Sequence, residues 1–285
     1  YRPESEGAKA FQAIARQTNN LLLVGGDFTL FNDLPRGGLA RITTAGALDP
    51  TFLATSAGFT NTVRAIVLQA DARILVGGSF TNANNTNRNY IVRLNTDGAT
   101  DSSFNPGAGA DNPVNAIALY TNATDTANLG KSIIGGSFAS YNGTVRNGLA
   151  RLNTDGSLDP TFDIGTGANG TIYSVALQTD GKVLVGGDFT SFNGVVNRNH
   201  LIRLNPDGSV DTAFNTVGPG ANAAVRVIVV QSDSKILIGG LFTGYNGAAN
   251  NFFARLLSNG QPDGAFTTQA AGGADNAVYS ISIQD

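Results

Sequence analysis

The residues with the greatest chemical capacity in this sequence are an arginine and an aspartate that recur together five times. In each case the aspartate follows the arginine by eight residues. The arginines are Arg41, Arg93, Arg151, Arg203 and Arg255, and the aspartates are Asp49, Asp101, Asp159, Asp211 and Asp263. A turn between them places the two side chains within reach across neighbouring strands, and an unpaired buried arginine would be costly. We interpret the pair as a structural staple between strands or blades, with a binding site as the alternative.

Histidine chemistry has a single candidate, His200. It occupies a variable position just before a strand, where other repeats have Tyr90, Gly148 or Phe252. Neither a Ser–His–Asp triad nor a multi-histidine metal centre can be built around it. We therefore expect no catalytic residues and predict that the chain is not an enzyme.

Carboxylates are also supplied by Asp-Gly turns (Asp97, Asp155, Asp207) and by Asp-Pro steps (Asp49, Asp159). Calcium requires several converging oxygen ligands, as in an Asp-x-Asp-x-Asp-Gly loop, and no such loop occurs. Cysteine is absent, which excludes thiolate metal sites. We predict no metal site and no cofactor. Calcium bound by loop carbonyls and paired carboxylates for glycoside hydrolysis stay open as alternatives.

Aromatic side chains recur in the long loops at Phe31, Tyr141, Phe192 and Tyr245, whereas Asn84 occupies this place in the second repeat. Exposed aromatic rings bind the faces of sugars, so these four residues are candidates for a glycan ligand. The alternative, which we prefer, is a hydrophobic plug beneath each loop.

The elements that must position these residues follow from a repeat marked by glycine pairs. The pairs are Gly25-Gly26, Gly77-Gly78, Gly135-Gly136, Gly186-Gly187 and Gly239-Gly240, at spacings of 52, 58, 51 and 53 residues. A period near 50 residues is typical of propellers and arrays of small sheets. Glycine within a strand usually marks a bulge or a close backbone approach, so we expect the pairs on inner strands near a shared axis.

Each repeat contains four short strands joined by tight turns. In the second repeat these are Val63–Gln69, Ile74–Phe80, Tyr90–Asn95 and the segment with Asp101 and Phe104. Both faces of the strands are apolar, so each sheet must lie between others like it. The sequence predicts an all-β propeller of five four-stranded blades in one repeat domain. Its units are about 11–62, 63–113, 114–171, 172–224 and 225–277.

Composition restricts the class of partner. The 285 residues carry a net charge of −3, only 14% are charged, and the basic residues are scattered. Nucleic-acid binding leaves a clustered basic surface, so we exclude that partner. No run of 18 apolar residues exists, which excludes a membrane span. The chain begins at Tyr1 rather than Met, which indicates a processed chain or a fragment.

One stretch carries a family resemblance. Residues 180–194, DGKVLVGGDFTSFNG, followed by residues 201–214, LIRLNPDGSVDTAF, closely resemble the delta-60 repeat of bacterial surface and secreted proteins. The resemblance covers the chain from about residue 10 to its end. It implies a β-propeller scaffold and export, with an extracellular or cell-surface location, and implies no catalytic residues. Kelch repeats are a weaker match, because their downstream Trp is missing.

The last residues, 278–285, match the first strand of a repeat and would be a twenty-first strand. They either begin a sixth blade that this chain lacks or pair with a neighbouring copy by strand addition. The function we expect is a non-catalytic scaffold or interaction propeller in adhesion or surface assembly. Its expected partners are proteins or copies of itself. The alternative is a carbohydrate-binding or polysaccharide-active propeller.

Overall fold

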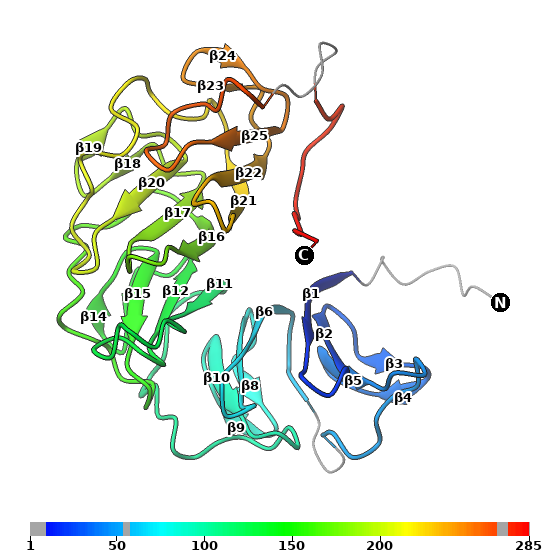
Figure 1. The fold of residues 1–285 in the computed structure, drawn as a ribbon. Helices are drawn as coiled ribbons and strands as arrows, with labels where there is room; N and C mark the ends of the chain where they lie inside the picture. Colours follow the sequence, from blue (N-terminus) through cyan, green and yellow to red (C-terminus); the bar gives the residue numbers. More distant parts are fainter. Residues whose placement is uncertain (1–9, 54–57, 267–272, 285) are drawn as a thin grey trace.

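The computed structural model describes residues 10–53, 58–266 and 273–284, and all regular secondary structure in them is β-strand. Five sheets of three antiparallel strands follow one another around a central axis (Figure 1). A two-stranded hairpin is added to each sheet in the long loop. The predicted all-β propeller of five blades is thereby confirmed. The described residues contain no helix that could cross a membrane.

The strands take the same order in every blade. The first strands are β1 (Phe11–Arg16), β6 (Val63–Leu68), β11 (Val114–Leu119), β16 (Ile172–Leu177) and β21 (Val225–Val230). The second strands are β2 (Leu22–Gly26), β7 (Ile74–Gly78), β12 (Ser132–Gly136), β17 (Val183–Gly187) and β22 (Ile236–Gly240). The third strands are β5 (Leu39–Ile42), β10 (Ile91–Leu94), β15 (Leu149–Leu152), β20 (Leu201–Leu204) and β25 (Phe253–Leu256).

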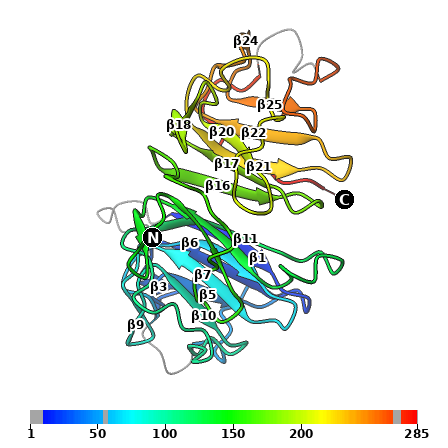
Figure 2. The same ribbon diagram turned by 90° about the vertical axis from the view of Figure 1, so that its left-hand side faces the viewer.

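The small hairpins lie between the second and third strands. They are β3 (Leu30–Phe31) with β4 (Leu34–Pro35), β8 (Asn82–Ala83) with β9 (Thr86–Asn87), β13 (Ser140–Tyr141) with β14 (Thr144–Val145), β18 (Ser191–Phe192) with β19 (Val195–Val196), and β23 (Gly244–Tyr245) with β24 (Ala248–Ala249). Figure 2 shows hairpins such as β3–β4 at one end of the blades and the turns from first to second strand at the other. The first strands of neighbouring blades lie against one another, so they are innermost.

The fourth strand of each blade is very short. It pairs with the third strand through one antiparallel bridge per blade, at Leu48, Thr100, Leu158, Val210 and Pro262. In the first blade the N–H of Asp49 then donates to the carbonyl of Arg41, and the Asp49 carboxylate accepts from the N–H of Thr51. That second hydrogen bond turns the chain away from the sheet. The outer strand therefore ends as soon as it has placed its aspartate beside the arginine.

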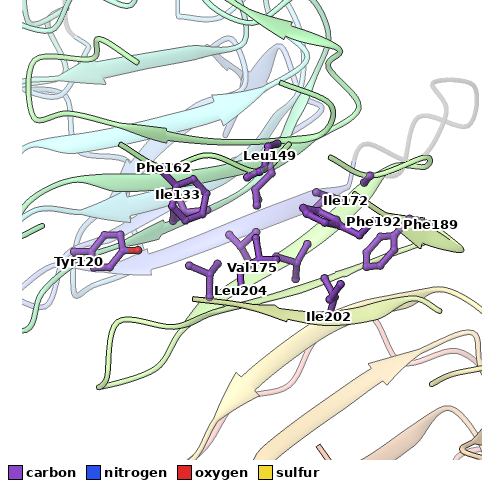
Figure 3. Packing of buried hydrophobic residues seen from close by; sticks show 14 residues of the cluster. Tyr120, Ile133, Leu149, Phe162, Ile172, Val175, Phe189, Phe192, Ile202 and Leu204 are labelled. Carbon is purple, nitrogen blue, oxygen red and sulfur yellow. The ribbon is translucent and has the colours of Figure 1, made fainter. Parts of the chain in front are cut away.

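The apolar core lies between the blades rather than within one of them. Figure 3 shows Ile133 and Leu149 of the third blade opposite Ile172 and Val175 of the fourth. All four side chains are buried. The second, third and fourth blades each have a neighbouring blade on both sides. Both faces of their strands therefore carry apolar residues, as the sequence predicted.

The glycine pairs lie on the second strands, next to the innermost first strands. The first glycine of a pair faces the next blade, and a Cβ on Gly186 would lie 2.9 Å from Cγ1 of Val225. The second glycine faces its own blade, and a Cβ on Gly187 would lie 2.2 Å from the carbonyl oxygen of Thr171. A β-bulge in the first strand brings that carbonyl so near.

These contacts predict the effect of substitution. We expect Gly186→Val to lower the free energy of unfolding by about 3 kcal/mol, because its methyl groups would overlap Val225 and Ile228 of the next blade. Gly187→Val should be at least as damaging, because the obstacle is backbone. Gly264→Ala is the control, since a Cβ there meets nothing within 4 Å. Urea unfolding measures all three. A Gly186→Val protein as stable as the parent would contradict the packing described.

Candidate functional site

The structure brings each recurrent arginine against its aspartate. The Nε atom of the arginine donates to Oδ2 of the aspartate at 2.8 Å, or 2.7 Å in the second blade. The guanidinium group also lies over the ring of the phenylalanine three residues after the aspartate, 4.3–5.1 Å from the ring centroid. The phenylalanines are Phe52, Phe104, Phe162, Phe214 and Phe266. Stacking on an aromatic face is favourable for a guanidinium group with little water around it.

The same arginine reaches the next blade, which the sequence reasoning missed. Nη1 of Arg93 donates to the carbonyl of Thr154 at 2.5 Å, and Nη1 of Arg151 donates to that of Pro206 at 2.7 Å. Arg41 and Arg203 make the same bond to Thr96 and Ser258. Each acceptor lies in the turn after the third strand of the following blade. We call this assembly of arginine, aspartate, phenylalanine and next-blade turn the blade joint.

Backbone hydrogen bonds extend the blade joint. The N–H of Asp163, next to Phe162, donates to the carbonyl of Asp207 at 2.7 Å in the following blade. The rings also pack beneath the next turn, since a Cβ on Gly156 would lie 3.0 Å from the ring of Phe104. The glycine in this turn therefore leaves room for the aromatic ring of the preceding blade.

The aspartate of the blade joint receives further hydrogen bonds. Burial by itself would raise the pKa of Asp101, but hydrogen bonds from Ser103 and from the Arg93 guanidinium outweigh it and lower the pKa to about 2. In later blades a lysine from the turn after the first strand also contacts the carboxylate. Lys131 lies 2.8 Å from Asp159, and Lys182 lies 3.0 Å from Asp211. The carboxylates are thus ionised acceptors whose partners lie within the fold.

The loop aromatics are not available to a ligand, which corrects the glycan-stacking interpretation for three of them. Tyr141, Phe192 and Tyr245 are at most 1% exposed, whereas Phe31 is partly exposed. The hydroxyls of Tyr141 and Tyr245 donate to the carbonyls of Gly156 and Gly260. The buried side chains of Tyr141, Phe192 and Tyr245 thus fill the space beneath their own loops.

The second repeat differs from the prediction in register. Ala83, which pairs with Thr86, occupies the position of Tyr141, which pairs with Thr144. Asn84 lies one residue farther on, and its amide donates to the carbonyl of Gly98 at 2.8 Å. That carbonyl corresponds to the acceptor of the tyrosine hydroxyl in the third and fifth blades. The asparagine therefore replaces the hydrogen bond of the missing ring.

His200 is buried in the fold and contacts the backbone. It is 9% exposed, its Nδ1 lies 3.2 Å from the carbonyl of Gly187, and burial lowers its pKa. Its φ of 65° is matched by Tyr90 and Phe252 in the same position of other blades. The position thus requires a left-handed backbone. Among the described residues, no three His, Cys, Asp or Glu side chains form a group that could hold a metal ion.

A polar row crosses the inner strands at their bulged start. Arg64 donates to Oδ1 of Asn115 at 2.7 Å, and the Asn115 amide donates to the carbonyl of Ile172 at 2.9 Å. In the later blades the guanidinium of Arg226 lies 3.7 Å from the ring centroid of Tyr173. Sequence reasoning missed this row because its residue types differ from blade to blade.

The opening between the first and fifth blades is the largest departure from the repeat (Figure 1). Val63 is fully buried against Gly25 of the preceding blade. In the first blade Phe11 and Ile14 occupy the positions of Val63 and Ile66. The described residues contain no blade that packs against them, and they are 58% and 68% exposed. Two apolar residues on β1 therefore lack the surface that covers their counterparts.

The C-terminal segment lies in this opening. Val278 packs on Gly239 as Val225 packs on Gly186, and its N–H donates to the carbonyl of Gly240 at 3.1 Å. Residues 278–284 nevertheless form no strand with any other described residues. The predicted extra strand is thus a segment in the position of a first strand, and Asp285 lies outside the described residues.

The repeat identifies the family. A family described as a domain of unknown function (DUF5122) beta-propeller matches residues 17–52, 69–104, 130–162, 178–214 and 231–266. The chain belongs to this family. Each match ends at the phenylalanine of a blade joint and includes its arginine and aspartate. No curated protein matches the sequence.

Solved structures are similar at the level of the fold. The extracellular domain of the putative one component system BT4673 from B. thetaiotaomicron matches at 16% identity and a TM-score of 0.53, over 90% of this chain and 28% of that chain. The WD40 beta propeller domain of Doa1 matches at 11% identity and a TM-score of 0.53, over 86% and 62% of the two chains. A gluconolactonase from Xanthomonas campestris, XC5397, matches at 11% identity and a TM-score of 0.47, over 79% and 67%. The present chain spans little more than a quarter of the BT4673 structure.

The blade joint predicts a graded effect of arginine removal. We expect Arg203→Ala to lower the free energy of unfolding by about 3 kcal/mol, because it leaves a buried carboxylate and a next-blade carbonyl without this partner. Arg255→Ala should cost clearly less, because the Arg255 side chain is 21% exposed and, among the described residues, it hydrogen-bonds only to Asp263 of its own blade. Urea unfolding of both variants measures the difference. Equal effects, or an Arg203→Ala melt identical to the parent, would contradict the inter-blade role.

Proposed function

We propose that this chain is a non-catalytic scaffold and interaction propeller of a bacterial surface or secreted protein, acting in adhesion or in surface assembly. The observation that carries the proposal is the exposure of Phe11 and Ile14 on β1, whose counterparts Val63 and Ile66 pack against Gly25 of the blade before them. An apolar surface of this kind is stabilised by a partner that supplies the missing strands.

The chemistry of the opening specifies the partner. Each covered first strand packs its apolar residues against a glycine on the second strand of another blade, as Val225 does against Gly186. The partner that fits Phe11 and Ile14 is therefore a strand that carries a glycine pair of the same kind. On the other side of the opening, residues 278–284 offer an unpaired segment to which such a strand can hydrogen-bond.

The recurrent polar residues support a scaffold rather than an enzyme. The arginines and aspartates are engaged in ion pairs within the fold. The likeness in fold to the extracellular domain of BT4673 supports an extracellular location. These points agree with the composition, which has few charged residues.

Self-association tests the proposal. We expect the purified chain to form oligomers or filaments in a concentration-dependent manner, detected by light scattering and electron microscopy. The double substitution Phe11→Ser and Ile14→Ser, or deletion of residues 278–284, should abolish them. Val196→Ser is the control, because Val196 is similarly exposed, at 62%, but lies on a small hairpin. A chain that stays monomeric at every concentration, with and without residues 278–284, would refute the proposal.

A further inference from the structure

A cavity of about 500 Å³ lies between the second and third blades, at the end where first strands turn into second strands. Gln69, Asp71 and Arg73 contribute to it from the turn of the second blade. Leu119, Leu129 and Asp155 contribute from the third blade. Its volume is within the range of sites that bind small molecules.

The cavity owes its apolar wall to an insertion found in the third repeat, at residues 121–130. This loop is internally bonded: the N–H of Leu129 donates to the carbonyl of Asp125 at 2.9 Å, and the Asn128 amide contacts the Asp125 carboxylate. The amide of Asn122 also bonds the carbonyl of Thr179 in the fourth blade. A folded loop thus holds Leu129, which is 46% exposed, at the cavity.

The corresponding groove between the fourth and fifth blades provides an internal comparison. It measures about 340 Å³ and has no apolar side chain in its lining, because the fifth blade has the short turn Ser232-Asp233-Ser234 where the third blade has the insertion. In that groove Oε1 of Gln178 accepts from Nη1 of Arg203 at 3.3 Å. The equivalent Oε1 of Gln69 is buried and has no hydrogen-bond partner among the described residues, which is also true of Gln17 and Gln231 in the first and fifth blades. The larger cavity therefore contains a buried acceptor that needs a donor.

Charge in the cavity is balanced. Arg73 pairs with Asp71 at 3.3 Å, and Arg93 at the cavity floor pairs with Asp101. Hydrogen bonds from the hydroxyl and N–H of Ser157 lower the pKa of Asp155, so this carboxylate is an ionised acceptor. Paired guanidinium and carboxylate groups can bond hydroxyls without requiring a charged ligand.

We propose that this cavity binds a neutral saccharide of one or two pyranose units. Leu119 and Leu129 pack against the C–H face of the ring, and a ring hydroxyl donates to Oε1 of Gln69. Asp71, Asp155 and Arg73 at the rim bond the remaining hydroxyls. A saccharide unites these requirements because it combines an apolar face with hydroxyls that both donate and accept.

The test measures binding of glucose, galactose, mannose, N-acetylglucosamine, maltose, cellobiose and lactose by saturation-transfer NMR and calorimetry. We expect at least one to bind. Gln69→Leu and Leu129→Ala should each raise the Kd of the bound sugar about tenfold, as the loss of one hydrogen bond or one apolar contact does. Replacing residues 121–130 by Thr-Asp-Gly, the turn of the fourth repeat, should abolish binding.

A matched pair separates binding from folding. Asp71 and Asp180 each accept from the N–H two residues later in the same turn of their blades. Asp71→Ala should weaken sugar binding, whereas Asp180→Ala should leave it unchanged, with equal small effects on the melting temperature. Failure of every sugar to bind, binding restricted to anionic sugars, or affinities unaltered by Gln69→Leu and Leu129→Ala would each overturn the proposal.

Discussion

The rest of the structure depends on the burial of one arginine guanidinium group in each of the first four blades. A buried cation must have its hydrogen bonds satisfied, and the joint satisfies them from three directions. The aspartate of the same blade supplies the negative charge, the phenylalanine supplies a flat apolar surface, and the turn of the next blade supplies a carbonyl. Because the third partner belongs to another blade, the requirement of Arg151 fixes the position of the fourth blade relative to the third.

The glycine pairs allow neighbouring blades to pack closely on the inner side of the interface that the blade joint holds together. The first glycine of each pair lets an apolar residue of the next inner strand approach closely, so that first strands can converge on the axis. This packing requires an apolar residue that covers the first glycine of the pair. At the fifth blade Val278 alone takes that place, and at the first blade Phe11 and Ile14 lie exposed. The opening is therefore a consequence of the packing rule, which is why we connect it with interaction.

Much of the fold and part of the blade joint could be predicted from the sequence. The eight-residue spacing of Arg203 and Asp211 placed them on adjacent strands, and the period of the glycine pairs indicated blades. The bond from Arg203 to Ser258 could not be predicted, because it depends on how two blades are placed side by side. Burial of Tyr245 likewise depends on a loop folding over it. The sequence aligns Asn84 with the loop aromatics, whereas the structure aligns Ala83 with them. A one-residue difference in hairpin register cannot be seen without the pairing partner. The insertion at residues 121–130 is visible in the sequence, but the cavity beside it exists only because two blades lie side by side.

Hydrogen exchange at the blade joints tests the central claim most directly. The amides of Asn105, Asp163 and Asn215 donate across the joints to the carbonyls of Asp155, Asp207 and Asn259. If the joints unite the blades into one cooperative structure, these amides should exchange as slowly as amides of the central second strands, at a rate set by global unfolding. Rapid exchange at the three joint amides, with the strands still protected, would show that the blades are held together by something other than the joint.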